Sequence, residues 1–107
     1  MYKVVISPSA DADLFSILKY IAYELENPQA ATEFADGVQR CYSDLEEMPS
    51  AHSLCADSLL RFKGYRKYPV ANYLIIYRVD EEAKEVRIVH IFHETQNYLE
   101  IQKSKYR

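Results

Sequence analysis

The 107-residue sequence has no long apolar run. Its first apolar stretch, residues 4–6, is far shorter than the run of about 7 residues in a signal peptide or about 18 in a membrane span. We therefore expect a cytoplasmic protein that does not enter a membrane. The sequence also has no internal repeat or low-complexity tract. Its length suits a single domain, residues 1–107, with one core.

Cysteine is scarce as well, with only Cys41 and Cys55 and no CxxC pair. His52 is the only nearby residue of another metal-ligating type, so a cysteine-based metal site is excluded, and we expect no metal and no cofactor. Cys41 falls in an apolar stripe at helical spacing and is expected to be a reduced core thiol. A disulfide between the two cysteines is disfavoured in a cytosolic chain.

Charge is distributed unevenly along the chain. Residues 1–59 carry three lysines and arginines against ten carboxylates, a balance of −7, whereas residues 60–107 carry ten against six, a balance of +4. The overall charge of −3 hides this difference. The split indicates that a polyanion or an acidic partner docks on the C-terminal half, unless the two halves simply attract each other.

The N-terminal half has the pattern of one strand and two helices. β-Branched residues predict a short strand over residues 2–6. Apolar residues at helical spacing then predict a helix over residues 8–25, with Ser7 as its N-cap. Asn27 and the proline after it end this helix and open a second one over residues 28–48. So short a connection predicts an antiparallel helix hairpin.

The C-terminal half has the two-residue period of strands. Residues 49–58 have the small and polar composition of a surface loop. Beyond them, strands are predicted over residues 72–79 and 85–92, with a polar hairpin turn between them and an earlier strand that meets an edge or break at Pro69. A short helix after His93 is also expected.

This element order predicts an α+β domain. It has a strand, a helix hairpin and then a three-strand antiparallel meander, with the helices packed on one face of a mostly antiparallel sheet. The expected core consists of Val5, Leu14, Leu18, Ile21, Phe34, Val38, Leu45, Ile75, Tyr77, Ile88 and Phe92.

The last predicted strand contains two histidines that differ in expected role. If side chains alternate regularly, His90 shares a face with the apolar Val86, Ile88 and Phe92. His93 would then share the other face with Arg87, Val89 and Ile91. We therefore expect His90 to be a core histidine with its hydrogen bonds satisfied and His93 to be available for function.

Four segments, taken in order, resemble the RelE/ParE superfamily of toxins from bacterial type II toxin–antitoxin modules. They are ISPSADADL, NPQAA, GYRKYPVANYLIIYRVDEE and IFHETQNY, and together they span nearly the whole chain. The resemblance implies a small toxin, of the kind linked to plasmid stabilisation, that a cognate antitoxin binds. It implies either a ribosome-dependent mRNA endonuclease (mRNA interferase), with ribosome and mRNA as partners, or a poison of DNA gyrase.

Metal-free RNA cleavage needs a base, an acid and cations that stabilise the phosphorane. Histidine is the side chain that can serve as acid or base near neutral pH, and His93 lies where similar toxins carry a functional basic residue. Arg66 supplies a fork for phosphate, and Lys63 and Lys67 supply further cations. The resemblance implies that Tyr98 stacks on the substrate or hydrogen-bonds to it. We therefore take His93, Arg66 and Tyr98 as catalytic candidates and the two lysines as phosphate-binding ones.

Each candidate also has a structural interpretation. Arg66 and Lys67 suit an exposed strand edge or an ion pair with the acidic helix face. The chain has ten tyrosines, and those at strand spacing, including Tyr65, Tyr68, Tyr73 and Tyr77, are expected mostly to pack on the sheet rather than to stack on bases.

The basic strands are also the expected site of an acidic, partly disordered antitoxin that adds a helix or a strand. We expect it to cover Arg66, Arg78 and Arg87.

Three departures from the RelE pattern weaken the nuclease interpretation. Leu74 stands where RelE-type enzymes commonly carry arginine, Glu94 places a negative charge beside His93, and the sequence pI is about 5.6, whereas ribosome binding favours a basic protein. The gyrase interpretation needs only an interaction surface. A non-toxic binding module on the same fold is a third possibility.

Overall fold

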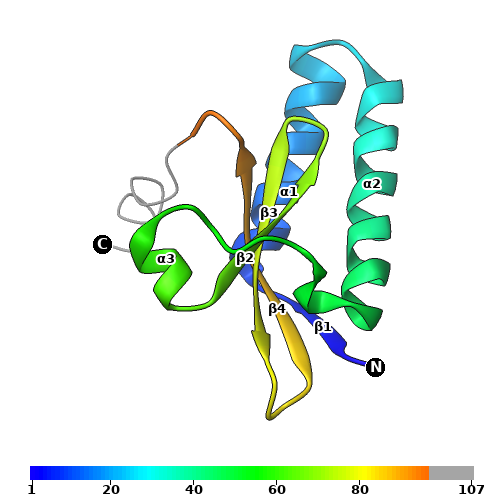
Figure 1. The fold of residues 1–107 in the computed structure, drawn as a ribbon. Coiled ribbons are helices and arrows are strands. Elements are labelled where there is room, and N and C mark those ends of the chain that lie inside the picture. Colours follow the sequence, from blue (N-terminus) through cyan, green and yellow to red (C-terminus); the bar gives the residue numbers. More distant parts are fainter. Residues whose placement is uncertain (97–107) are drawn as a thin grey trace.

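The computed structural model describes residues 1–96, and these residues form an α+β fold (Figure 1). The elements in chain order are β1 (Lys3–Ile6), α1 (Pro8–Lys19), the π-helical turn η1 (Tyr20–Glu24), α2 (Pro28–Glu47), the 3-10 turn η2 (Pro49–Ala51), α3 (Ser58–Phe62), β2 (Tyr65–Val70), β3 (Tyr73–Asp80) and β4 (Glu85–His93).

The four strands form one mixed sheet in the order β1-β4-β3-β2. The β2–β3 and β3–β4 pairs are antiparallel, which confirms the predicted meander. β1 pairs with β4 in the parallel direction, which requires a long connection, and the helix hairpin and two strands between them in the chain provide it. No helix within residues 1–96 is long and apolar enough to cross a membrane.

The helix hairpin begins and ends where the capping residues indicate. The Ser7 side chain accepts the N–H of Ala10 at 3.0 Å and caps α1. Asn27 accepts the N–H of Ala30 at 3.1 Å and caps α2. α1 continues into the π-helical turn η1, and the chain then reverses over residues 25–27, where Glu26 has a positive φ of 50°. These caps satisfy backbone donors that a helix start leaves free, and the predicted antiparallel hairpin is confirmed.

The main core lies between the hairpin and one face of the sheet (Figure 1). Most of the predicted core is buried, with Leu14 and Leu18 partly so. Val5 is the exception, with 36% of its surface exposed. Its neighbours Val4 and Ile6 pack on the core instead, because alternate residues of β1 face opposite sides.

A second, smaller cluster covers the other face of the sheet. Phe92 belongs to it, together with Cys55, Leu60 and Ile76. Leu60 comes from α3, which lies across the sheet from the hairpin in Figure 1. This helix was not predicted, and its start is set by Asp57, whose carboxylate accepts two backbone N–H groups.

A β-bulge changes the expected faces of β4. Ile76 pairs with His90 while its neighbour Tyr77 pairs with Ile88, so Val89 is the extra residue. The insertion reverses the alternation beyond that point. His93 pairs with Tyr73 and therefore lies on the hairpin face, together with Ile88 and Ile91. The predicted grouping of His93 with Arg87 and Val89 is thus wrong.

The C-terminal end of β4 extends past β1, and side chains form hydrogen bonds with the exposed edge there. Ser7 Oγ donates to the carbonyl of Val89 at 3.0 Å. An Asp13 carboxylate oxygen accepts the N–H of Ile91 at 3.0 Å and lies 3.1 Å from Nδ1 of His90. His90 is 2% exposed, so the prediction of a partnered core histidine is confirmed. Unpaired strand edges invite unwanted pairing, and these contacts remove that opportunity.

Candidate functional site

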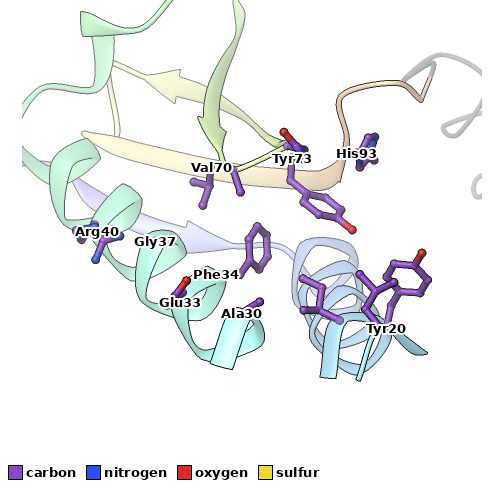
Figure 2. A pocket seen from close by; sticks show the side chains of 13 residues that line it. Tyr20, Ala30, Glu33, Phe34, Gly37, Arg40, Val70, Tyr73 and His93 are labelled. Carbon is purple, nitrogen blue, oxygen red and sulfur yellow. The ribbon is translucent and has the colours of Figure 1, made fainter. Parts of the chain in front are cut away.

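A cleft of about 490 Å³ opens between the hairpin and the β2–β3 turn. Figure 2 shows its side chains, which come from η1, α2, both strands beside the turn and the end of β4. The residues labelled there are Tyr20, Ala30, Glu33, Phe34, Gly37, Arg40, Val70, Tyr73 and His93. Its volume and its apolar walls with a few polar groups are typical of binding sites.

Close packing of α2 against β2 shapes one end of the cleft. Gly37 is buried, and a Cβ atom added there would lie 2.7 Å from Cγ1 of Val70. Only glycine therefore allows the helix and strand to approach this closely. The β2–β3 turn follows directly, with Ala71 at a positive φ of 53°.

Aromatic rings form the middle of the cleft. The ring centroids of Phe34 and Tyr73 are 5.0 Å apart, and those of Tyr73 and His93 are 5.2 Å apart in an edge-on arrangement. In Figure 2 these three side chains follow one another across the cleft. Burial raises the pKa of the Tyr73 hydroxyl, and the nearby Tyr20 raises it further. Tyr73 is therefore a neutral hydrogen-bonding group at physiological pH.

The hydrogen bonds of His93 determine which ring nitrogen carries its proton. The backbone N–H of Thr95 donates to Nδ1 at 3.2 Å, and the Thr95 hydroxyl oxygen lies 2.8 Å from the same atom. A backbone N–H can only donate, so Nδ1 is an acceptor and the neutral ring carries its proton on Nε2. Within residues 1–96, Nε2 has no hydrogen-bond partner. His93 therefore offers the cleft a hydrogen-bond donor.

The other nuclease candidates do not gather around His93. Arg66 pairs with Tyr77 in β2–β3, four residues along β3 from Tyr73, the partner of His93. The two positions are therefore about 13 Å apart along the strands and about 10 Å apart across them. The Arg66 guanidinium donates to the carbonyl of His52 at 2.6 Å and so holds the preceding loop.

The two lysines lie elsewhere too. Lys67 pairs with Ile76, whose side chain belongs to the second cluster, so Lys67 is on the face opposite Arg66. Lys63 caps the C-terminal end of α3. Tyr98 lies outside the described residues. The structure thus brings His93 into the cleft and does not bring Arg66, Lys63 or Lys67 there.

The three arginines expected to bind an antitoxin also divide between faces. Arg78 and Arg87 lie directly opposite each other on β3 and β4, on the face away from the hairpin. Arg87 forms ion pairs with Asp80 at 3.4 Å and with Glu85 at 3.2 Å. Arg66 is on the hairpin face. Arg78 and Arg87 therefore share one face of the sheet, and Arg66 lies on the other.

Several cleft residues were not predicted from the sequence. Phe34 was expected only as a core residue, and neither Tyr73 nor Arg40 was given a functional role. They belong to α2 and β3, and no local pattern indicates that these elements meet around a cleft. Within residues 1–96, no group of three or more His, Cys, Asp or Glu side chains is arranged to hold a metal ion.

Solved structures of similar fold come from toxin–antitoxin systems. One is described as the chromosomal ParDE system of P. aeruginosa, with a TM-score of 0.69, 20% identity, and coverage of 87% of this chain and 96% of that chain. Another is a RelBE toxin–antitoxin complex from Mycobacterium tuberculosis, with a TM-score of 0.61, 22% identity, and coverage of 86% and 96%. Sequence identities this low show only that the fold is shared. The shared fold agrees with the predicted RelE/ParE-like architecture.

The family comparison covers most of the chain. No curated protein sequence matches it. Residues 4–98, however, match the family described as the ParE toxin of the type II toxin–antitoxin system parDE. The match includes both helices of the hairpin, β1 from its second residue, β2 to β4 and the cleft. The chain therefore belongs to the ParE toxin family of type II toxin–antitoxin systems.

Proposed function

We propose that this toxin inhibits DNA gyrase by binding it and does not cleave RNA. The observation that carries the proposal is the separation of Arg66 from His93 in the sheet, about 13 Å along the strands and two strand spacings across. Phosphoryl chemistry requires the acid, the base and the cations to surround one phosphate. An inhibitor that acts through binding requires only a surface with a few anchor residues.

The protonation of His93 supports the same proposal. With Nδ1 accepting from Thr95, the neutral ring has its proton on Nε2. In this tautomer Nε2 is a hydrogen-bond donor. It is well suited to donate a hydrogen bond to a carbonyl or carboxylate of a bound protein.

The surroundings of Leu74 also favour binding over phosphate chemistry. Leu74 pairs with Phe92 and packs in the second apolar cluster, on the face opposite the cleft. A phosphate ligand at this position would have to be held among apolar side chains, where an unpaired charge is costly. The position thus contributes to the stability of the sheet.

We also propose a cognate antitoxin as partner, as in the two toxin–antitoxin complexes of similar fold. Arg78 and Arg87 face each other on one side of the sheet. Arg87 is already paired with Asp80 and Glu85, whereas Arg78 has no ion pair among residues 1–96 and can attract an acidic segment. Charge reversal at both positions should weaken antitoxin binding roughly tenfold or more. Reversal at Arg66, on the other face, should leave binding nearly unchanged, and equal losses at all three positions would contradict this location.

Controlled expression in a bacterial host tests the proposed target. We expect growth arrest with induced DNA breaks and a DNA-damage response, while mRNA stays intact. Co-expression of the cognate antitoxin should restore growth, which controls for the burden of expression. Rapid loss of translation with mRNA cut at ribosome positions, and no DNA breaks, would show the nuclease instead.

A further inference from the structure

The outer side of the helix hairpin carries a second hollow, separate from the cleft. This groove, of about 560 Å³, lies between α1 and α2. Its wall on the α1 side is formed by Phe15, Lys19 and Tyr23, and its floor on the α2 side by Ala31, Thr32 and Ala35. Phe34, Gly37 and Arg40 of α2 line the cleft instead, so the groove and the cleft use different sides of that helix.

The aromatic side chains of this groove are exposed to an unusual degree. Phe15 is 69% exposed and Tyr23 is 75% exposed. The floor, on the α2 side of the groove, consists of small residues. A helix laid in the groove could approach the floor closely and bury both rings, which is the geometry of helix–helix contacts.

The charges along α1 indicate what that helix is. Asp11, Phe15 and Lys19 follow one another at four-residue spacing and therefore lie on one stripe of the helix. Asp11 and Lys19 are about 12 Å apart along the axis and cannot pair with each other. Neither takes part in an ion pair among residues 1–96. The stripe thus offers one charge of each sign, with an exposed ring midway between them.

Such a stripe is complementary to itself in the antiparallel direction. When α1 of a second copy lies antiparallel to it, centred on Phe15, Asp11 of each copy faces Lys19 of the other. The two Phe15 rings then meet at the two-fold axis. A parallel arrangement would place Asp11 against Asp11 and Lys19 against Lys19, which is repulsive. Two-fold contacts of this type are the commonest in homo-oligomers.

We propose that the groove and the Asp11–Phe15–Lys19 stripe form a homodimer interface in which two copies pack antiparallel through α1. Burial of Phe15 and Tyr23 drives the association, and the two charge pairs set its direction. The inference is independent of the proposed gyrase target, since neither the cleft nor the sheet takes part.

A charge-swap experiment on the full-length chain tests this interface. Sedimentation equilibrium at low ionic strength should show a monomer–dimer equilibrium. Asp11→Lys alone and Lys19→Asp alone should each weaken self-association at least tenfold, because each places like charges opposite each other twice. A mixture of the two single variants should recover dimers, since both cross-contacts then join Lys with Asp. Phe15→Ala should abolish dimers of the unchanged chain.

Glu82→Lys, an exposed charge reversal in the turn between β3 and β4, is the matched control and should leave association unchanged. Circular dichroism and thermal unfolding establish that each variant is folded. The proposal is overturned if the unchanged chain stays monomeric at every concentration, as it would if another protein occupies the groove. It is also overturned if the mixture of single variants associates no better than either alone.

Discussion

Arg66 and His93 lie on the same face of the sheet but on strands that β3 separates, with partners four residues apart along β3. Arg66 is also held by the His52 carbonyl, whereas the His93 ring borders the cleft. The two side chains therefore have different roles: Arg66 fixes a loop, and His93 contributes to a binding surface.

The double variant Arg66→Ala, His93→Ala should keep part of its toxicity when expressed, because a binding inhibitor loses only one of several contacts when His93 is removed. Loss of the Arg66 bond should lower the free energy of unfolding by about 1 kcal/mol, which leaves a folded protein. Growth arrest on induction, normalised to the amount of folded toxin, is the measurement. Complete loss of toxicity in a stable, antitoxin-binding double variant would favour the nuclease.

Tyr42 and Tyr77 allow a matched test of buried hydroxyl groups. Tyr77 donates to the carbonyl of Pro49 at 2.7 Å, whereas the buried hydroxyl of Tyr42 has no hydrogen-bond partner in the described part of the chain. Tyr77→Phe should lower the free energy of unfolding by about 1 kcal/mol, and Tyr42→Phe should raise it by about 1 kcal/mol. Urea denaturation measures both. Effects of the same sign would contradict this assignment of partners.

Gly37 and Val70 test the close approach of α2 to β2. Gly37→Ala should lower the free energy of unfolding by about 1–2 kcal/mol, because the new methyl group collides with the stiff Val70 side chain. In a Val70→Ala background the same change should be neutral or stabilising, by up to about 1 kcal/mol, since alanine is the better helix former. If Gly37→Ala cost the same in both backgrounds, another contact would be responsible.

Asp13 tests the closure of the β4 edge. Its carboxylate accepts the N–H of Ile91 and contacts the ring of the buried His90. Asp13→Ala should lower the free energy of unfolding by about 2 kcal/mol, because buried polar groups lose their partner. Amide hydrogen exchange at Ile91 should rise with it. Asp36→Ala, an exposed change on α2, should stay within about 0.5 kcal/mol of the unchanged chain, and an equal effect there would undermine the role given to Asp13.

Local signals in the sequence predicted most of the fold. Asn27 and Pro28 marked the break between the helices, and alternation marked β3 and β4, because capping and periodicity act over a few residues. The bulge at Val89 could not be predicted, since it depends on the register of β4 against β3. Beyond the bulge the alternation is reversed, so His90 and His93 lie on the faces opposite to those that regular alternation predicts.

The candidate site was harder to predict for the same reason. His93 was identified as a candidate, and it does line the cleft. Phe34 and Tyr73 complete the aromatic row, yet they come from elements far apart in the chain. Arg66 and Lys67 are adjacent in sequence but face opposite sides of β2, so sequence proximity suggested a cluster that the strand geometry divides.

The most direct test of the gyrase proposal uses purified components. The toxin is incubated with DNA gyrase, ATP and relaxed plasmid, and in parallel with translating ribosomes and a defined mRNA. We predict that supercoiling is inhibited, with linear DNA accumulating as toxin is added, and that the mRNA stays intact. Normal supercoiling together with mRNA cut on the ribosome would contradict the proposal.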